Sequence, residues 1–280
     1  MEKIIEISCL EHIYPDKTVI ELCGLEFTVE KGEKVALLGP NGGGKTTLIK
    51  HITGLLSSKT GNIKVFGVDP SKDFGKIRHK IGVVFQNAEE QLLGPTVIDD
   101  VMFSPLNYGY NKQIAKDMAE AILDRLNIFH LKDKVIHYLS GGEKRKVALA
   151  GALIMNPELL ILDEPFAALD LKAQRELIKL INSISAEKGL SVVVSTHDVE
   201  LVCEFADTMY LISSKNKISK KGKPTEIFAL DDELNHYNLE KPPILKLFSA
   251  LKSQGIDIGT PLTIEDAAAV IADVINSKKH

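Results

Sequence analysis

The stretch Gly39-Pro40-Asn41-Gly42-Gly43-Gly44-Lys45-Thr46-Thr47 has the form GxxxxGK[ST] of a phosphate-binding loop. The apolar run 35–38 before it is typical of a buried strand, and the run 48–52 after it predicts a helix that begins near Lys45. A glycine-rich turn that happened to be followed by Lys-Thr would not have this context of strand, loop and helix. We therefore expect a nucleoside triphosphate as the ligand.

The expected chemistry of this loop comes from its backbone and from two side chains. Glycines let several N–H groups point inward at phosphate oxygens, and the helix N-terminus adds partial positive charge. We expect Lys45 to reach the β and γ phosphates and the Thr46 hydroxyl to ligate Mg²⁺. The expected phosphate-binding set is Gly39, Pro40, Asn41, Gly42, Gly43, Gly44, Lys45, Thr46 and Thr47. Upstream, Tyr14 either stacks on adenine through its ring face or simply ends a strand, and its position leaves both interpretations open.

Length and composition limit the class of protein. The 280 residues suit one large domain with or without a small appendage, and 26% charged and 44% apolar residues are typical of a soluble globular protein. A net charge of −4 gives no general electrostatic reason to bind nucleic acid, so no nucleic-acid partner is expected. Cys9, Cys23 and Cys203 are odd in number and lack CxxC spacing, which favours a reducing cytosol and argues against a metal cluster.

Signals for targeting and for membrane insertion are not seen in the sequence. Glu2 and Lys3 lead straight into a strand-like segment, without the pattern of a signal peptide. Apolar runs such as 159–162 are too short to cross a bilayer. If the protein acts at a membrane, we expect it to do so from the cytosolic side.

Strand and helix patterns alternate along the chain and predict an α/β fold. Segments 4–10 and 19–29 are expected to be strands of an antiparallel β subdomain. The alternation between residues 34 and 196 predicts a mainly parallel core sheet. The strand-like segments after the phosphate loop are 62–66, 81–85, 158–164 and 191–196.

Helical patterns divide the rest of the chain. The span 87–155 is mostly helical and predicts an inserted α-helical subdomain, in which Ser140 caps a helix with Glu143 at its third position. Further helices are expected near 96–99, at 112–126, from 140 to about 155, and at 171–184. We expect a cassette over 1–235 and a short helical appendage over 236–280, whose apolar helix faces need a partner surface.

Two carboxylates at the end of an apolar strand carry the expected catalytic chemistry. Asp163 suits a ligand of Mg²⁺ and Glu164 a general base for the attacking water, the alternative being a solvated strand end. Ligands bind at the carboxyl ends of such parallel strands. Gln86 and His197 also follow apolar strands, where a side chain can reach a γ-phosphate or that water, although a lone Gln or His is more often unremarkable.

Taken together and in this order, the motifs resemble the ATP-binding cassette (ABC) family over roughly residues 3–230. The resemblance is carried by Gly39 to Thr47, Gln86, Leu139-Ser140-Gly141-Gly142-Glu143, Leu159 to Glu164, Ala167-Ala168-Leu169-Asp170 and His197. The LSGG stretch discriminates most strongly, because other P-loop ATPases and GTPases lack it. The resemblance implies a P-loop NTPase fold of the ABC type and hydrolysis of ATP with Mg²⁺.

The resemblance also implies a head-to-tail dimer with a second ABC ATPase protomer, the same chain or a paralogue. In it, Ser140 and Gly142 of one protomer meet the γ-phosphate held by Lys45 of the other. The remaining implied roles are stacking of Tyr14 on adenine, sensing of Mg²⁺ and the transporter by Gln86, communication across the dimer by Asp170, and contact of His197 with the γ-phosphate. The chain departs from the commonest pattern at Thr46, Glu143, Phe166 and Ala168, and none of these changes removes a catalytic group.

Within the family, the chain looks like the ATPase subunits of energy-coupling factor transporters, including cobalt and nickel importers. The residues are Tyr14-Pro15-Asp16, Phe85-Gln86-Asn87, Gln91, Pro95-Thr96-Val97, Asp100-Val101, Phe103, Pro105-Leu106-Asn107, the run 139–153 and Gly259-Thr260-Pro261-Leu262-Thr263. This likeness implies uptake of a micronutrient, with cobalt or nickel ion favoured over a vitamin. It further implies a peripheral position on the cytoplasmic face of the membrane, an integral membrane coupling protein docked near residues 86–107, and a substrate-binding membrane component.

The main alternative is a soluble ABC ATPase acting on DNA or ribosomes. DNA-repair members carry long coiled-coil arms or zinc modules between the phosphate loop and LSGG, for which the span here is too short. Translation-associated members usually join two cassettes in one chain. A nonhydrolytic scaffold is disfavoured by the intact Glu164 and His197, and a GTPase by the lack of an NKxD motif.

Overall fold

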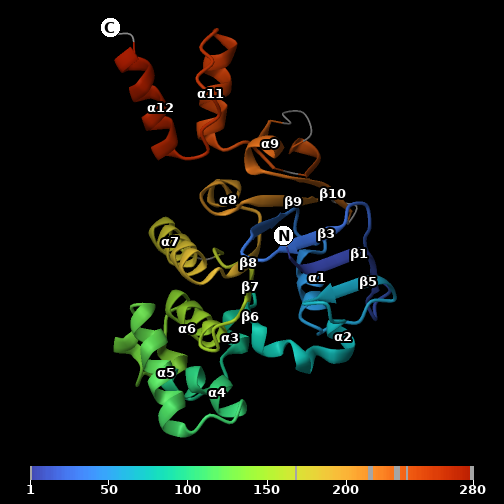
Figure 1. Ribbon diagram of the computed structural model, residues 1–280, viewed down its shortest axis with the longest axis vertical. Coiled ribbons are helices and arrows are strands. Elements are labelled where there is room, and N and C mark those ends of the chain that lie inside the picture. The colour runs from blue at the N-terminus through green and yellow to red at the C-terminus, as the bar shows by residue number, and fades with distance from the viewer. Residues whose placement is uncertain (1, 168, 214–216, 230–233, 238, 278–280) are drawn as a thin grey trace.

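The computed structural model describes residues 2–167, 169–213, 217–229, 234–237 and 239–277. Its main parts are two β-sheets, a helical region and two C-terminal helices, α11 (Pro243–Ser253) and α12 (Ile264–Ser277). Figure 1 shows α11 and α12 standing away from the sheets. Ala168, one of the departures from the commonest family pattern, lies outside the described residues.

The core sheet is mainly parallel, as predicted. Among the described residues it has six strands in the order β10-β9-β4-β8-β7-β6, and only β9 and β10 pair antiparallel. The strands are β4 (Lys34–Leu38), β6 (Ile81–Val84), β7 (Leu159–Asp163), β8 (Ser191–Thr196), β9 (Thr208–Ile212) and β10 (Ile218–Gly222). β7 and β8 are buried over their whole length, as expected of central strands covered on both faces. Their register pairs Asp163 with Ser195, which brings their carboxyl ends to one edge of the sheet.

The second sheet is antiparallel, also as predicted, with β1 paired to each of its other strands. It contains β1 (Lys3–Ile13), β2 (Val19–Leu22), β3 (Phe27–Glu30) and β5 (Thr60–Val65). The sequence predicts a single strand over 19–29, and the structure corrects this to two. Gly24 between them has φ 123°, and a Cβ atom there would lie 2.6 Å from the carbonyl oxygen of Ile218. The chain therefore turns against β10 at a position that only glycine fits.

Cys9 and Cys23 form a disulfide bond. The antiparallel register of β1 and β2 pairs Leu10 with Leu22, so the two cysteines become neighbours with Cα atoms 4.0 Å apart. This bond departs from the reducing environment that the cysteine count favours, because spacing along the chain does not reveal neighbours across strands. Cys203 is a free thiol, and its burial raises its pKa to about 12.

α1 (Lys45–Ile52) begins at Lys45, as predicted. Its buried Leu48, Ile49 and Ile52 belong to an apolar cluster that also contains residues of β1, β3, β4 and β7, so the helix is packed between the two sheets. The short elements α2 (Pro70–Asp73), η1 (Phe74–Lys76) and η2 (Arg78–Lys80) lead from β5 to β6.

A helical region occupies most of the predicted span 87–155. It contains α3 (Ala88–Gln91), α4 (Val97–Asn107), α5 (Lys112–Arg125), η3 (Phe129–Leu131), η4 (Ile136–Tyr138) and α6 (Gly141–Leu153). The side chains of Thr96, Asn111 and Ser140 each accept a backbone N–H at the start of α4, α5 and α6, respectively. The predicted capping box between Ser140 and Glu143 is confirmed.

The remaining helices cover the core sheet and then lead to the tail. They are α7 (Leu171–Lys188), α8 (Val199–Phe205), α9 (Pro224–Phe228) and η5 (Asn235–Tyr237). α7 runs past its predicted end at residue 184 and stops at Gly189, which has φ 63°. None of the helices that the structure describes combines the length and the apolar composition needed to span a bilayer.

The tail is attached through α11. Leu245 of α11 packs in an apolar cluster with Phe228 and Tyr237. The side chains of Ile264 and Ile275 on α12 remain 66% and 52% exposed, so the apolar face of this helix has little cover within the described chain. The boundary between cassette and appendage near residue 235 stays a prediction.

Candidate nucleotide-binding and catalytic site

The phosphate-binding loop connects β4 to α1 and is fitted closely against its neighbours. A Cβ atom on Gly39 would lie 2.6 Å from the carbonyl oxygen of Ile212 in β9. Gly44 has φ 97°, and a Cβ atom there would lie 2.9 Å from a methyl group of Ile20 in β2. Glycine is therefore required at both ends of the loop, and the tight backbone leaves its N–H groups available to an anion.

Lys45 is folded back into the loop that precedes it. Its side chain is only 6% exposed, and Nζ donates hydrogen bonds to the carbonyl oxygens of Gly39 at 2.8 Å and Pro40 at 3.3 Å. Nζ also lies 3.4 Å from Oε1 of Glu164. A buried ammonium held by two carbonyls and one carboxylate is an attractive partner for an incoming phosphate.

Asp163 and Glu164 lie at the carboxyl end of β7 and are held by β8. Ser195 Oγ donates a hydrogen bond to Oδ1 of Asp163 and accepts one from the N–H of Glu164 at 3.0 Å. The same N–H lies 3.0 Å from the carbonyl oxygen of Ser195, and Glu164 has φ 48°, an uncommon conformation for a residue other than glycine. Ser195 therefore fixes the position of both carboxylates.

Oδ2 of Asp163 is buried without a hydrogen-bond partner among the described residues, and Oε1 of Glu164 has no hydrogen bond there beyond its ion pair with Lys45, 3.4 Å away. Buried polar atoms are nearly always satisfied, so these oxygens fit a site completed by a cation or a water molecule. Hard oxygen donors such as Asp163 and the Thr46 hydroxyl on α1 suit Mg²⁺. The residues present thus fit the expected metal ion.

His197 joins the cluster from the loop after β8. Its Nδ1 lies 3.0 Å from Oε2 of Glu164, while its side chain is 64% exposed. The structure therefore brings together four of the predicted site residues: Lys45, Asp163, Glu164 and His197. Gln86 is placed differently, because its side chain is exposed and makes no hydrogen bond within the part of the chain described here.

Tyr14 connects the antiparallel sheet to the helix after the loop. Its hydroxyl forms a 2.8 Å hydrogen bond with Oγ1 of Thr47. The Tyr14 ring makes an edge contact with His12, and His12 makes another with His51. His51 is fully buried, both ring nitrogens lack a partner among the described residues, and burial lowers its pKa to about 4. Tyr14 thus ends a strand beside the loop, a position that remains compatible with stacking on a base.

Ser140 and Gly142 lie at the start of α6, and among the described residues neither forms a hydrogen bond or an ion pair with the Lys45 cluster. Ser140 Oγ donates to Oε2 of Glu143 at 2.8 Å, and the Ser140 N–H donates to the same oxygen at 2.8 Å. These two hydrogen bonds lower the pKa of Glu143, and Lys134 Nζ lies 3.8 Å from its other oxygen. Beside them is a cavity of about 270 Å³ that Leu169 also lines.

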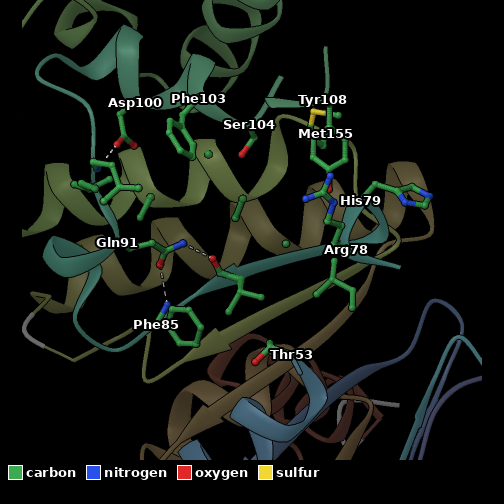
Figure 2. Close-up of a pocket in the computed structure, with 18 of the residues that line it drawn as sticks. Thr53, Arg78, His79, Phe85, Gln91, Asp100, Phe103, Ser104, Tyr108 and Met155 are labelled. Atoms are coloured by element: carbon green, nitrogen blue, oxygen red, sulfur yellow. Dashed lines mark hydrogen bonds between the residues drawn. The ribbon is translucent and has the colours of Figure 1, made fainter. Parts of the chain in front are cut away.

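A groove of about 320 Å³ lies between the core sheet and the helical region. Figure 2 shows Phe103, Ser104 and Tyr108 above it, with Phe85 and Gln91 across from them. Gln91 fixes the end of β6, because its side chain donates to the carbonyl oxygen of Val83 at 2.7 Å and accepts the N–H of Phe85 at 3.1 Å. The side chains of Phe103 and of Leu93, which also lines the groove, are 49% and 69% exposed.

Some of these contacts could not be assigned from the sequence. Ser195 was missed because a serine at the end of a strand carries no motif, although its place opposite Asp163 follows once the strand register is known. Arg145 was also missed. It lies on α6 and donates to the carbonyl oxygens of Ala167 and, at 3.4 Å, of Gln86.

Comparison with known proteins gives consistent matches. The family model described as ABC transporter matches residues 22–167. The chain is 39% identical over 271 residues to the energy-coupling factor transporter ATP-binding protein EcfA of Methanoculleus marisnigri, covering 96% of this chain and 97% of that protein. It is 38% identical to the EcfA of Methanocaldococcus jannaschii, over 98% of this chain and 99% of the relative.

Solved structures match over most of the chain as well. The structure of cbiO1 from Clostridium perfringens, part of the ABC transporter complex cbiONQ, has a TM-score of 0.74 at 34% identity and covers 89% of this chain and 100% of that one. The structure of a dimeric bacterial ABC transporter cassette has a TM-score of 0.70 at 26% identity. The match covers 79% of this chain and 98% of the cassette. The fold described above is therefore shared with the cassettes of these two solved structures.

Proposed function

Since this chain belongs to the ABC transporter family, as an ATP-hydrolysing cassette of the energy-coupling factor type, we propose that it powers an importer for a micronutrient. ATP binding and hydrolysis are properties of the family. In this proposal an integral membrane coupling protein receives the energy of hydrolysis. The observation that carries it is the groove lined by Phe85, Gln91 and Phe103, because it puts exposed apolar side chains next to the loop that holds Gln86.

We assign the binding of ATP to the phosphate-binding loop and α1. Phosphate oxygens displace the Gly39 and Pro40 carbonyls from Lys45, and the loop N–H groups and the start of α1 add further donors. Tyr14 stacks on adenine while its hydroxyl keeps its bond to Thr47. Thr46, Asp163 and Gln86 would hold Mg²⁺, which would neutralise charge on the phosphates when bound.

Hydrolysis is assigned to Glu164 as general base. Its carboxylate takes a proton from the attacking water as the water oxygen bonds to the γ-phosphorus, and the bond to the ADP oxygen breaks. The contacts of Glu164 with Lys45 and His197, and the clamp of Ser195 on its N–H, hold the carboxylate at the end of β7. In the same proposal, the His197 side chain contacts the γ-phosphate.

The second half of the site comes from a partner protomer in the proposal. Ser140 is exposed and Gly142 half-buried, and the N-terminus of α6 would offer N–H groups and partial positive charge to an anion outside this chain. A head-to-tail dimer, formed with a second copy or a paralogue, brings them to the γ-phosphate on Lys45. The likeness to a dimeric cassette supports this arrangement.

The groove and the relatives support the proposed membrane partners. An apolar element of the coupling protein packs against Phe103 and Leu93, with the cassette peripheral on the cytoplasmic face of the membrane and a substrate-binding membrane component beside the coupling protein. Cobalt or nickel ion is the favoured substrate, supported by the likeness to cbiO1 of the cbiONQ complex.

The proposal is tested by capturing the chain from detergent-solubilised membranes of the native host and identifying copurifying proteins by mass spectrometry. A small integral membrane protein together with a metal-binding membrane component supports the importer. Phe103→Asp in the groove should abolish this copurification, whereas Ile114→Asp, on the exposed surface of α5, should leave it intact. Recovery of ribosomal or DNA-repair proteins instead would assign the ATPase to the soluble class.

A further inference from the structure

Arg145 is a half-buried cation without a carboxylate partner. None of the ion pairs among the described residues includes it, its Nε is buried without a hydrogen bond, and burial lowers its pKa. Its Nη1 donates to the carbonyl oxygen of Ala167, and its Nη2 to that of Gln86 at 3.4 Å. Even partial burial of a charge that has no opposite charge beside it is unfavourable, and an apolar side chain at this position would avoid that cost. Packing alone therefore does not explain this arginine.

The two carbonyl groups belong to segments that leave neighbouring strands of the core sheet. Gln86 follows β6, and Ala167 follows β7, which is paired with β6. Ala167 is itself linked to the general base, because its N–H donates to the carbonyl oxygen of Glu164 at 3.3 Å. A guanidinium presents several donors in a fixed plane, so it can hold two carbonyl groups at once.

A second side chain, on another helix, holds the same turn. Gln174 of α7 donates from Nε2 to the carbonyl oxygens of Phe166 and Leu169, each at 3.2 Å. The described part of this turn therefore accepts hydrogen bonds from α6 through Arg145 and from α7 through Gln174. If α6 moves relative to α7, the hydrogen bonds of Arg145 or those of Gln174 to this turn must change.

α6 connects these contacts to the groove and to the partner-facing surface. Ser140 and Gly142 lie at its start, Arg145 one turn later, and Ala148 and Ala152 farther along line the groove. An element bound in the groove therefore presses on the same helix that holds Gln86 and Ala167.

We propose that Arg145 is a positioning residue that couples the groove to the catalytic site, by tying the carbonyl group after β6 to the carbonyl group after β7. α6, Gln86 and Glu164 then shift together when ATP binds or when the groove is filled. This inference rests on the proposed function, which identifies the groove as the docking site of the coupling protein and the Lys45 cluster as the site of ATP hydrolysis. It adds a named link between them.

The test is amide hydrogen exchange on the full-length chain in a Glu164→Gln background, with and without ATP and Mg²⁺. The segments followed are 39–47, 85–91 and 164–167, in the parent and in Arg145→Lys, Arg145→Met and Lys144→Met variants. Lys144→Met is the matched control, since it removes the 2.8 Å contact of α6 with Glu89 of α3 and leaves both carbonyl contacts in place. Lysine keeps the charge of Arg145 but lacks the planar fork.

ATP should slow exchange in all three segments of the parent and of Lys144→Met. In both Arg145 variants, the slowing at 39–47 should be retained, while at 85–91 and 164–167 it should fall by about fivefold, the effect of one hydrogen bond on a local opening equilibrium. Equal slowing in parent and Arg145 variants would overturn the coupling role. So would exchange that is faster by the same factor with and without ATP, because that result is expected of a purely structural contact. A parent chain that shows no slowing at 39–47 would instead refute the nucleotide site, and the coupling with it.

Discussion

The Lys45 side and the Ser140 side of the site are built in opposite ways. Lys45 and Glu164 are each 6% exposed, and they are held by the phosphate-binding loop and by the end of β8 with the loop that follows it. Ser140 is exposed, and within the described part of the chain its hydroxyl forms hydrogen bonds with Glu143 alone. The buried side is therefore preorganised within one chain, whereas the exposed side takes its partner from a second protomer only in the proposed dimer. Changes on the buried side should have large effects on chemistry or stability, and changes on the exposed side small effects on association.

The largest expected effect is that of Glu164→Gln on hydrolysis. Loss of the general base should lower kcat for ATP at least about 100-fold, while nucleotide binding persists because the Lys45 loop is intact. Steady-state hydrolysis and equilibrium binding of ATP measure the two effects separately. Glu176→Gln, at an exposed position on α7, is the control and should hydrolyse ATP like the parent. A Glu164→Gln chain as active as the parent would remove Glu164 from its assigned role.

The next effect concerns stability in acid. Because His51 has a pKa of about 4 in the folded chain and 6.5 as its ordinary value, the unfolded chain binds more protons below pH 6.5. The contribution of His51 to the free energy of unfolding is present above pH 6.5 and is lost progressively down to pH 4, with a loss of about 2 kcal/mol between pH 7 and pH 5. His12 faces His51 and lowers its pKa further.

Urea unfolding at pH 7 and pH 5 checks this contribution. His51→Leu should have a smaller difference in stability between the two pH values than the parent, whatever its absolute stability. The exposed His79 offers a control, since His79→Leu should keep the difference of the parent. Identical differences in parent and His51→Leu would contradict the prediction.

A smaller effect is expected when the clamp on the two carboxylates is removed. Ser195→Ala should lower kcat about tenfold, because Asp163 loses a donor and the N–H of Glu164 an acceptor. Ser191→Ala is a matched control on the same strand, where the hydroxyl accepts the Gly32 N–H at 2.8 Å, away from the site. Both variants should lose similar stability in thermal unfolding, but only Ser195→Ala should lose activity. Equal kcat values would show that the clamp is merely structural.

The smallest effect is expected on the exposed side. Glu143→Gln keeps an acceptor for the Ser140 N–H but removes a negative charge that faces a partner's phosphates in the proposed dimer. In a Glu164→Gln background, the ATP-dependent dimer should tighten about two- to threefold, and the difference should disappear in high salt. Sedimentation at two salt concentrations measures both. A weaker dimer, or a difference that salt does not change, would contradict this assignment.

The division between buried and exposed sides also explains how far the sequence alone could be interpreted. The phosphate-binding loop, the carboxylates after β7 and the cap of α6 were predicted because each is a local pattern, with strand, loop and helix adjacent in the chain. The break at Gly24 was not predicted, since it depends on close contact with Ile218, which is remote in sequence.

The contacts that act across elements were the ones that the sequence could not provide. Ser195 reaches Asp163 through strand register, Arg145 reaches Ala167 through the packing of α6, and Cys9 meets Cys23 through hairpin pairing. Each pairing depends on a distance in space, for which a single sequence has no periodic signal. The roles of the site residues stay predictions, although the structure brings Lys45 and Glu164 together.

The disulfide has a consequence for the segment that carries Tyr14. Cys9 and Cys23 are 14 positions apart, and the bond between them turns the segment into a closed ring. A ring of this size has fewer unfolded conformations than an open chain, which stabilises the folded state by about 3 kcal/mol in the loop-closure description. The tip of the first hairpin is thereby ordered by a covalent bond as well as by packing. When neighbouring strands fray, the ring therefore keeps Tyr14 close to β1 and β2.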